Sequence, residues 1–120
     1  MGYLDLYLLP VRTNREADYQ AMANLGKTVW LEHGALTYSE HRADDVPPGV
    51  VTSFPMSVKL EADEVLYVGV VTYRDRAHRD TVNALVMADP RFDQFMDNSP
   101  ADMQRMIFGG FATVVDGAAL

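Results

Sequence analysis

Hydrophobic residues alternate along two stretches of the chain with the two-residue period of a β-strand. In residues 3–11 one face carries Leu4, Leu6 and Leu8, and the other carries Tyr3, Asp5, Tyr7 and Leu9. In residues 64–73 one face carries Leu66, Val68 and Val70, and the other carries Val65, Tyr67, Val71 and Tyr73. Both stretches predict strands that are largely apolar on two faces, and Gly69 indicates a bulge or a close approach by a ligand.

Capping residues place a helix after each of two strands. Thr13 and Glu16 have the spacing of a capping box, and Gly34 suits a C-terminal cap, so we expect the first helix between them. Asp75 suits the N-cap of the second helix, which Pro90 ends. The apolar stripe of the second helix consists of His78, Val82, Leu85 and Val86.

The other segments complete the order of elements. Residues 35–43 predict a polar strand at a margin of the sheet, and residues 106–115 predict a last strand. Residues 44–57 are irregular and residues 92–103 are rich in turns. The order strand, helix, strand, strand, helix, strand predicts an α+β fold: one ferredoxin-like βαββαβ domain over residues 1–120, with a four-stranded antiparallel sheet and two helices on one face.

The second face of this sheet needs a cover, because two helices cover one face only and an apolar face of that size is unfavourable in a monomer. We expect a second copy to supply it, in a face-to-face homodimer that places Tyr67 in the interface. A cavity between or beside the sheets is expected to be lined by Asp5, Tyr7, Tyr67 and Tyr73. The alternative cover is the segment of residues 44–57, folded back within the chain.

Composition excludes several classes of protein. The chain has 10 Lys and Arg against 17 Asp and Glu, a net charge of −7 that argues against a nucleic-acid partner. It has no Cys, which excludes disulfides and thiolate metal sites. No run approaches about 18 apolar residues and no signal peptide is recognised, so we expect a cytoplasmic protein without a membrane span.

Arg76 and Arg79 lie beside His78 at the start of the second helix, where the helix dipole disfavours cations. Two interpretations stay open. Pairing within the helix, of Asp75 with Arg79 and of Arg76 with Asp80, would offset the positive charge. Alternatively, the helix N-terminus and the two guanidinium groups would form an anion site for a carboxylate or a phosphate.

Candidate catalytic residues are His78 and Asp5. His78 lies on the apolar stripe within one turn of the helix start, where it could serve as a base or a ligand, and a hydrogen-bonded structural histidine is the alternative. The aromatic candidates could orient a ligand by apolar contact and phenol hydrogen bonds, or could belong to the dimer interface. The ligand-binding candidates are Tyr7, Tyr38, Phe54, Tyr67, Tyr73, Arg76 and Arg79.

Motifs for tightly bound groups are missing from the sequence. It has no phosphate-binding loop, dinucleotide fingerprint, nucleophile elbow or paired-histidine metal helix. We therefore expect no cofactor and no metal ion.

Five segments together resemble one protein family. They are EHGAL (32–36), VTSFP (51–55), RAHRD (76–80), VMADPR (86–91) and RMIFGGF (105–111). On these segments the whole chain resembles the YbaA-like family of small bacterial proteins of unknown function, members of the dimeric α/β-barrel superfamily. The resemblance implies a ferredoxin-like protomer and a homodimer, and it supplies no catalytic residue.

Two classes of function stay open. The first is a homodimeric protein that binds a small anionic or aromatic ligand in a cavity by the sheet face. The second, by analogy of fold alone, is a small-molecule enzyme of the monooxygenase or isomerase type that works without a cofactor. In that enzyme Asp5 and His78 would be base candidates and the arginines an anion clamp. Heme binding, with His78 as the axial ligand, is a minor alternative.

Overall fold

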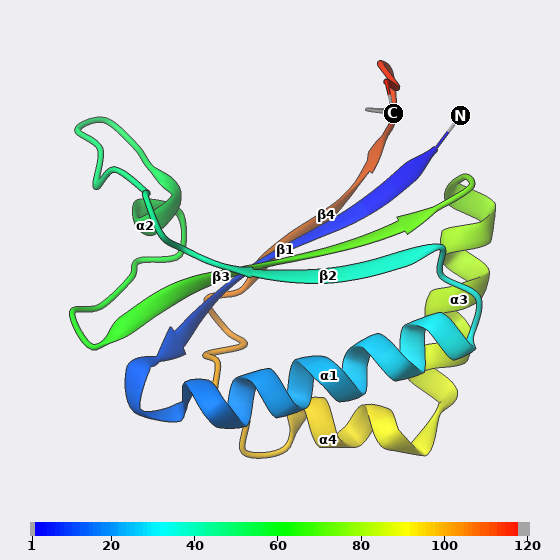
Figure 1. Ribbon diagram of the computed structural model, residues 1–120, viewed down its shortest axis with the longest axis horizontal. Helices are drawn as coiled ribbons and strands as arrows, with labels where there is room; N and C mark the ends of the chain where they lie inside the picture. The colour runs from blue at the N-terminus through cyan, green and yellow to red at the C-terminus, as the bar shows by residue number, and fades with distance from the viewer. Residues whose placement is uncertain (1, 118–120) are drawn as a thin grey trace.

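The computed structural model describes residues 2–117 and shows a four-stranded antiparallel sheet with helices on one face (Figure 1). The strands are β1 (Tyr3–Arg12), β2 (Thr37–Arg42), β3 (Glu64–Tyr73) and β4 (Ile107–Ala112). The helices are α1 (Glu16–Glu32), α2 (Phe54–Ser57), α3 (Arg76–Ala88) and α4 (Asp93–Met96), with 3₁₀ turns at Thr13–Arg15 and Pro90–Phe92. The predicted α+β, ferredoxin-like fold is confirmed, with the short helices α2 and α4 added in the connections.

The strands lie in the order β2-β3-β1-β4, so the polar strand β2 is at a margin of the sheet, as the sequence predicts. β1 and β3 pair along their whole length, from Tyr3 opposite Tyr73 to Arg12 opposite Glu64. Gly69 lies in this regular register and forms no bulge. Its role is therefore a close approach between groups on the sheet surface.

Two of the three predicted helix caps are confirmed. The Asp75 side chain accepts a hydrogen bond from the backbone N–H of His78 at 2.8 Å, which begins α3. Gly34 has a φ of 107° just past the end of α1, a conformation that glycine adopts without steric cost. The capping box is wrong, because the Thr13 hydroxyl donates to the Asp63 carbonyl instead and a 3₁₀ turn precedes α1.

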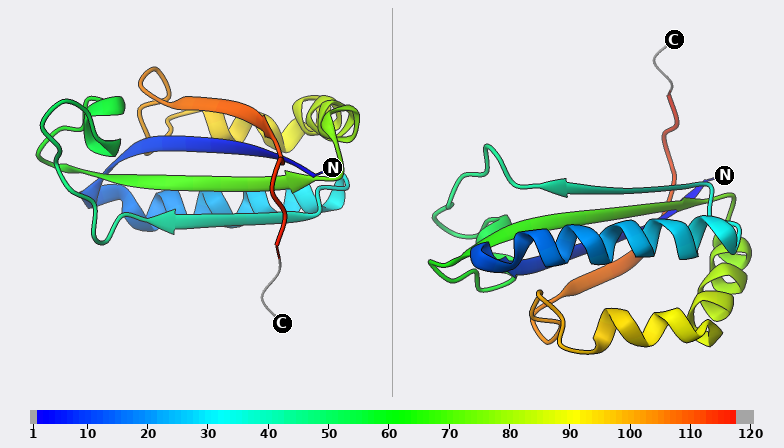
Figure 2. Two further views of the ribbon diagram at one scale, coloured as in Figure 1. Left: turned by 90° about the horizontal axis from the view of Figure 1, so that it is seen from above. Right: turned by 60° about the horizontal axis from the view of Figure 1, so that its bottom comes forward.

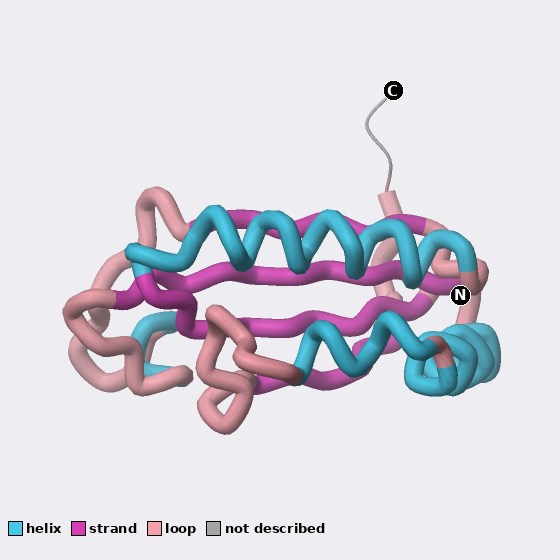
Figure 3. The backbone as a smooth tube through the Cα atoms, turned by 90° about the horizontal axis from the view of Figure 1, so that it is seen from below, coloured by secondary structure: helices cyan, strands magenta, loops and turns pink. Residues whose placement is uncertain are grey.

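The helices cover the sheet face that carries the tyrosines. Val29 of α1 and Val82 and Val86 of α3 form one core cluster with Val71 and Tyr73 of β3. Viewed from the helix side, α1 runs along one margin of the sheet, and α4 lies along the other margin, with α3 seen nearly end-on at its end (Figure 3). The middle of the sheet lies between these two sets of helices, and this arrangement positions the site described below.

The opposite face is covered in part by the segment between β2 and β3. Val58 in this segment forms a core cluster with Leu8 and Leu66, and Leu60 packs against it. The segment rises from one end of the sheet on the side away from α1, as Figures 1 and 2 show. The alternative cover expected from the sequence is thus present at one end, but among residues 2–117 it leaves the outward side chains near β4 partly exposed, including the half-exposed Phe111.

Tyr67 is not on that outer face. Its side chain packs against Tyr19 of α1, with ring centroids 4.6 Å apart, so the expectation that it belongs to the face covered by a second copy is wrong. Strand alternation separates two faces but does not say which of them the helices cover.

Among residues 2–117, no helix has the length and apolar character that a membrane span requires.

Candidate functional site

A cavity of about 400 Å³ lies between the helices and the middle of the sheet. Aromatic and methionine side chains form most of its wall, a composition typical of small-molecule sites. The aromatic part includes Trp30, Tyr38, Phe92, Phe95 and Phe108. The methionines are Met22, Met87, Met96, Met103 and Met106.

One transverse row of the sheet forms the floor of this cavity. Glu40 of β2 lies opposite Gly69 of β3, Gly69 lies opposite Tyr7 of β1, and Tyr7 lies opposite Phe108 of β4. The rings of Tyr7 and Phe108 are stacked with centroids 5.9 Å apart. Because Gly69 has no side chain, the Glu40 carboxylate fits against it, and the row has this carboxylate at one end and an aromatic pair at the other.

Two glycines make room for polar groups at the cavity wall. A Cβ atom at Gly69 would lie 3.1 Å from Glu40 Oε2, closer than ordinary van der Waals contact. A Cβ atom at Gly26 of α1 would lie 2.7 Å from the Tyr38 hydroxyl oxygen. Alanine at either position would therefore displace the Glu40 carboxylate or the Tyr38 hydroxyl.

Glu40 carries the formal charge of the cavity, since it is the one ionisable residue with a charged form at neutral pH among the described residues that line it. The Tyr19 hydroxyl donates to Glu40 Oε1 at 2.6 Å and lies 3.1 Å from Oε2. Burial raises the pKa of the Glu40 carboxyl, and the Tyr19 hydrogen bond opposes that rise. The carboxylate is therefore held in place by a tyrosine but is poorly solvated.

The phenols of Tyr7 and Tyr38 are available to a ligand. Burial raises the pKa of both hydroxyls, so both stay protonated and can donate a hydrogen bond. Among residues 2–117, no fully enclosed side-chain oxygen or nitrogen lacks a partner. Neither phenol is hydrogen-bonded to another described side chain, so both reach the open space of the cavity.

A second, more polar groove adjoins the cavity and shares Tyr38 and Glu40 with it. Lys27 and Gln20 of α1 and Arg42 of β2 line this groove. Arg42 is engaged by Glu16, at 2.6 Å from Nε to Oε1. Glu40 thus lies where an apolar cavity meets a polar groove, a position from which its carboxylate can exchange protons with solvent.

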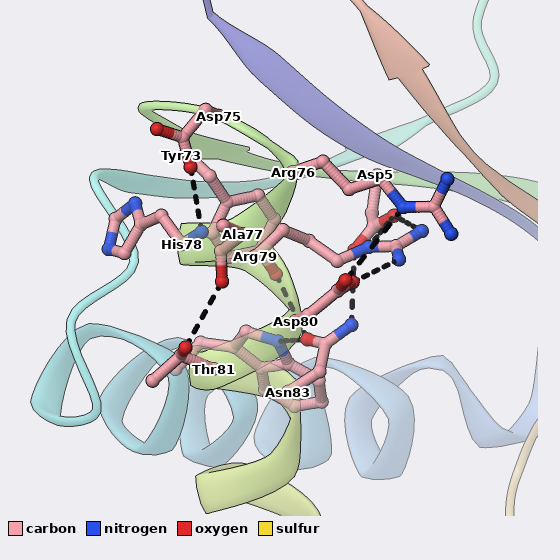
Figure 4. A network of polar contacts seen from close by, with 11 residues as sticks. Asp5, Tyr73, Asp75, Arg76, Ala77, His78, Arg79, Asp80, Thr81 and Asn83 are labelled. Atoms are coloured by element: carbon pink, nitrogen blue, oxygen red, sulfur yellow. Dashed lines mark hydrogen bonds and ion pairs between the residues drawn. The ribbon is translucent and has the colours of Figure 1, made fainter.

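Asp5 and Arg79 form a polar network beside the cavity, on its α3 side (Figure 4). Asp5 is only 3% exposed, and Arg79 Nε donates to its two carboxylate oxygens at 3.0 and 3.1 Å. Arg79 also pairs with Asp80 at 2.8 Å, and Asn83 donates to Asp5 Oδ2 at 3.3 Å. Arginine pairing is therefore observed, but the partner of Arg79 is Asp5 on β1 in place of the expected Asp75.

Both ring nitrogens of His78 are hydrogen-bonded to backbone. Nδ1 accepts from the Arg74 N–H at 3.0 Å, which leaves Nε2–H to donate to the Gly34 carbonyl at 2.9 Å. The ring lies edge-on to Tyr73 and is not part of the cavity lining. This geometry joins the turn after α1 to the start of α3, and a catalytic role for His78 stays a prediction.

The other candidates are distributed over different parts of the molecule. Tyr73 donates to Asn83 Oδ1 at 3.1 Å, within the network of Asp5. Tyr67 lines the polar groove and donates to Glu16. Arg76 and Phe54 are exposed, Arg76 on α3 and Phe54 on α2 at the outer face. Of the sequence candidates, the cavity brings together only Tyr7 and Tyr38.

Sequence reasoning missed Glu40 and Tyr19, the polar pair of the cavity. Glu40 reads as one charge among several on a polar edge strand, and nothing local marks it as inward-facing. Alternation along β2 could have placed Tyr38, Glu40 and Arg42 on one face, with Tyr38 indicating that this face is covered.

The described residues offer no grouping of three or more His, Asp or Glu side chains able to hold a metal ion. The cavity lining within residues 2–117 contains no histidine to act as an axial heme ligand, although its methionines and tyrosines include atoms that can bind iron.

Fold and cavity together define a small α+β protein with a largely apolar cavity between sheet and helices. The chain belongs to the family described as "Protein of unknown function (DUF1428)", whose model matches residues 2–103. The uncharacterized protein YbaA of Escherichia coli is 37% identical over 116 residues, which cover 97% of this chain and 99% of the relative. The same values hold for YbaA of Shigella flexneri, so the resemblance seen in the sequence is confirmed.

Solved structures share the fold at low sequence identity. SnoaB from Streptomyces nogalater, a cofactor-independent oxygenase, has a TM-score of 0.63 and 11% identity, covering 96% of this chain and 95% of its own. Rv0793 from Mycobacterium tuberculosis has a TM-score of 0.64 and 11% identity, with 98% and 100% covered. A dimeric ferredoxin-like protein from an uncultured marine organism has a TM-score of 0.58 and 13% identity, with 97% and 98% covered.

Proposed function

We propose that this protein is a homodimer in which each protomer binds a neutral or weakly polar aromatic molecule in the cavity between its helices and its sheet. The observation that supports this most directly is the lining, which is aromatic and methionine-rich with a few phenol donors. Apolar walls supply binding free energy and the hydroxyls of Tyr7 and Tyr38 supply orientation. A cytoplasmic location stays a prediction from the sequence.

An anionic ligand fits this cavity less well than a neutral one. The formal charge at the wall is the Glu40 carboxylate, which repels an anion. The guanidinium group of Arg79 is occupied by Asp5 and Asp80, so it is not free to bind a carboxylate or phosphate. The geometry therefore favours the aromatic half of the sequence prediction.

The dimer proposal rests on the outer face of the sheet. Phe111 and Ile107 of β4 are 54% and 43% exposed. On the same face, the partly exposed Leu4 lies opposite Phe111, and the partly exposed Leu6 and Val70 lie opposite each other on β1 and β3. A contiguous apolar face of this kind is unfavourable in water. One solved structure of the same fold is described as dimeric, which supports a second copy as the cover.

The binding proposal is tested with two fluorescent probes that differ by one sulfonate group. N-phenyl-1-naphthylamine is neutral, and 8-anilinonaphthalene-1-sulfonate is its anionic counterpart. We expect the neutral probe to bind more tightly than the sulfonate. In Glu40→Gln we expect a smaller difference in affinity between the two probes, because the charge that repels the sulfonate is gone. Equal affinities, or preference for the sulfonate, would contradict the proposed ligand class.

A glycine variant locates the binding site. Gly69→Ala places a methyl group on the cavity floor, so we expect roughly tenfold weaker binding of the neutral probe, since overpacking costs about 1–3 kcal/mol. Gly117→Ala is the control, because a Cβ atom there meets no other atom within 4 Å. Unchanged affinity in Gly69→Ala would show that the probe binds elsewhere.

Catalysis without a cofactor is the second candidate function. The observation that favours it is Glu40, a carboxylate in a largely apolar cavity. The solved structure of a cofactor-independent oxygenase with this fold adds support of a general kind only, because fold does not determine chemistry.

A further inference from the structure

We infer that Glu40 is a general base that removes a proton from a carbon next to the carbonyl group of a bound aromatic ketone, with Tyr7 or Tyr38 donating to the carbonyl oxygen. This inference rests on the proposed binding function and adds the substrate class and the residues that act on it. The geometry behind it comes from three parts of the site.

The first part is the position of the carboxylate. Glu40 stands at one end of the floor row, with Gly69 between it and Tyr7. A Cβ atom at Gly69 would lie 3.1 and 3.3 Å from its two carboxylate oxygens, so the carboxylate lies against Gly69, and both residues line the cavity with Tyr7. A ligand on this floor would therefore have a base at its edge.

The second part is the support of the carboxylate. The buried Tyr19 hydroxyl, on α1, donates to Glu40 Oε1 at 2.6 Å and leaves lone pairs on both oxygens free. A catalytic base has to be held in a fixed orientation, and this hydrogen bond provides one. Poor solvation increases the basicity of the carboxylate, in agreement with the direction of its pKa shift.

The third part is the pair of phenol donors. Tyr38 stands on the same strand face as Glu40, two residues away, and Tyr7 stands on the floor row. Tyr7, Tyr38 and Glu40 line the same cavity, and burial followed by the charge of Glu40 raises the pKa of Tyr38, so its hydroxyl stays a donor. Preorganised donors of this kind stabilise an oxyanion as it forms.

The proposed step needs no oxidant and no further reactant. Glu40 takes the proton, the C–H bonding pair becomes the new carbon–carbon double bond, and the carbonyl π pair moves to oxygen as an enolate. A phenol hydrogen bond stabilises that oxygen. The carboxylic acid exchanges its proton with solvent and then delivers one to the same carbon, which gives isotope exchange, or to a conjugated carbon, which gives an isomer.

The experiment uses 2-tetralone, a bicyclic aromatic ketone, in D₂O. Displacement of N-phenyl-1-naphthylamine first measures its binding, and NMR then follows loss of the hydrogens next to the carbonyl. We expect exchange above the protein-free rate, with a rate that rises with pH as Glu40 loses its proton, and an inflection above the ordinary value of a glutamate. In Glu40→Gln the rate should fall by roughly 100-fold while the neutral probe still binds.

Glu32→Gln is the matched control, because Glu32 lies outside the cavity and pairs with Arg91. It should leave the exchange rate unchanged. Exchange that survives in Glu40→Gln, or no exchange although 2-tetralone displaces the probe, overturns the role of Glu40. Failure of 2-tetralone to displace the bound probe overturns the ketone as substrate class. Failure of the neutral probe to bind the wild-type protein overturns the binding function itself.

Discussion

At the scale of single residues, Glu40 has the least favourable environment among the side chains that line the cavity. Its carboxylate is withdrawn from water and faces aromatic and methionine side chains, with Tyr19 as hydrogen-bond donor. A charge in such a place reduces the stability of the fold at neutral pH. Residues of this kind are enriched at functional sites, because function and stability make different demands on them.

Glu40→Gln should change stability in a pH-dependent way. The folded pKa of Glu40 is raised, so the protonated form is favoured by folding, and this stabilisation is complete below the unfolded pKa and lost as pH rises through the folded pKa. The glutamine side chain of the variant does not titrate, and it keeps an acceptor for Tyr19. We expect the variant to melt at a higher temperature than wild type at pH 8 and at a similar one near pH 4, measured by calorimetry. A variant less stable than wild type at pH 8 would show that the charge is well compensated.

At the scale of elements, the Asp5–Arg79 pair joins the central strand β1 to helix α3. The two residues are 74 positions apart in sequence, and their contact attaches α3 to the sheet (Figure 4). His78, one residue earlier on the same helix, binds the Gly34 carbonyl and so links α3 to the turn after α1. The cationic start of α3 is thus explained by contacts within the protomer.

Arg79→Ala should destabilise the fold more than it affects any ligand. Asp5 is 3% exposed, so removal of its partner leaves a buried carboxylate unpaired, at a cost of about 3–5 kcal/mol. Arg76→Ala is the control, since its side chain is 74% exposed and its contact with Asp80 is 3.8 Å, so its effect should stay within about 0.5 kcal/mol. Urea denaturation measures both. If Arg79→Ala instead kept its stability and lost binding of the sulfonate probe, the anion-site interpretation would be supported.

At the scale of the whole molecule, the protomer has two apolar surfaces with different covers. The helices enclose the cavity face, whereas the segment between β2 and β3 covers only one end of the outer face. The rest of the outer face is the surface on which we propose that a second copy packs. Cavity and proposed dimer interface are therefore on opposite sides of one sheet, and binding and association can be tested separately.

Phe111→Asp should convert the proposed dimer to a monomer. Phe111 lies on the outer face of β4 opposite Leu4 and is half-exposed in the protomer. A charge at this position stays hydrated in the monomer, so the fold tolerates it, but it would lose that hydration in a dimer interface. Leu85→Asp, on the exposed side of α3, should leave the association unchanged. Sedimentation velocity distinguishes the states. A dimer that persists in Phe111→Asp would place the interface on another surface.

The sequence by itself determined the order of the elements, the N-cap of α3 at Asp75, the C-terminal cap of α1 at Gly34 and the position of β2 at a margin of the sheet. These features follow from interactions within a few residues, and the corresponding patterns are local. Tyr7 and Tyr38 could be proposed as ligand residues from the sequence as well, because a phenol on a strand combines an apolar ring with a hydrogen-bond donor.

Only the tertiary structure decided which face of the sheet the helices cover, and with it the site. Tyr67 lies on the helix side of the sheet and not in the expected interface. Arg79 pairs with Asp5 on β1, and Glu40 lines the cavity. Each of these outcomes depends on groups that are distant in sequence and adjacent in space. Glu40 reaches the cavity floor because Gly69, opposite it on the next strand, leaves room for its carboxylate, and no pattern within one segment contains that information.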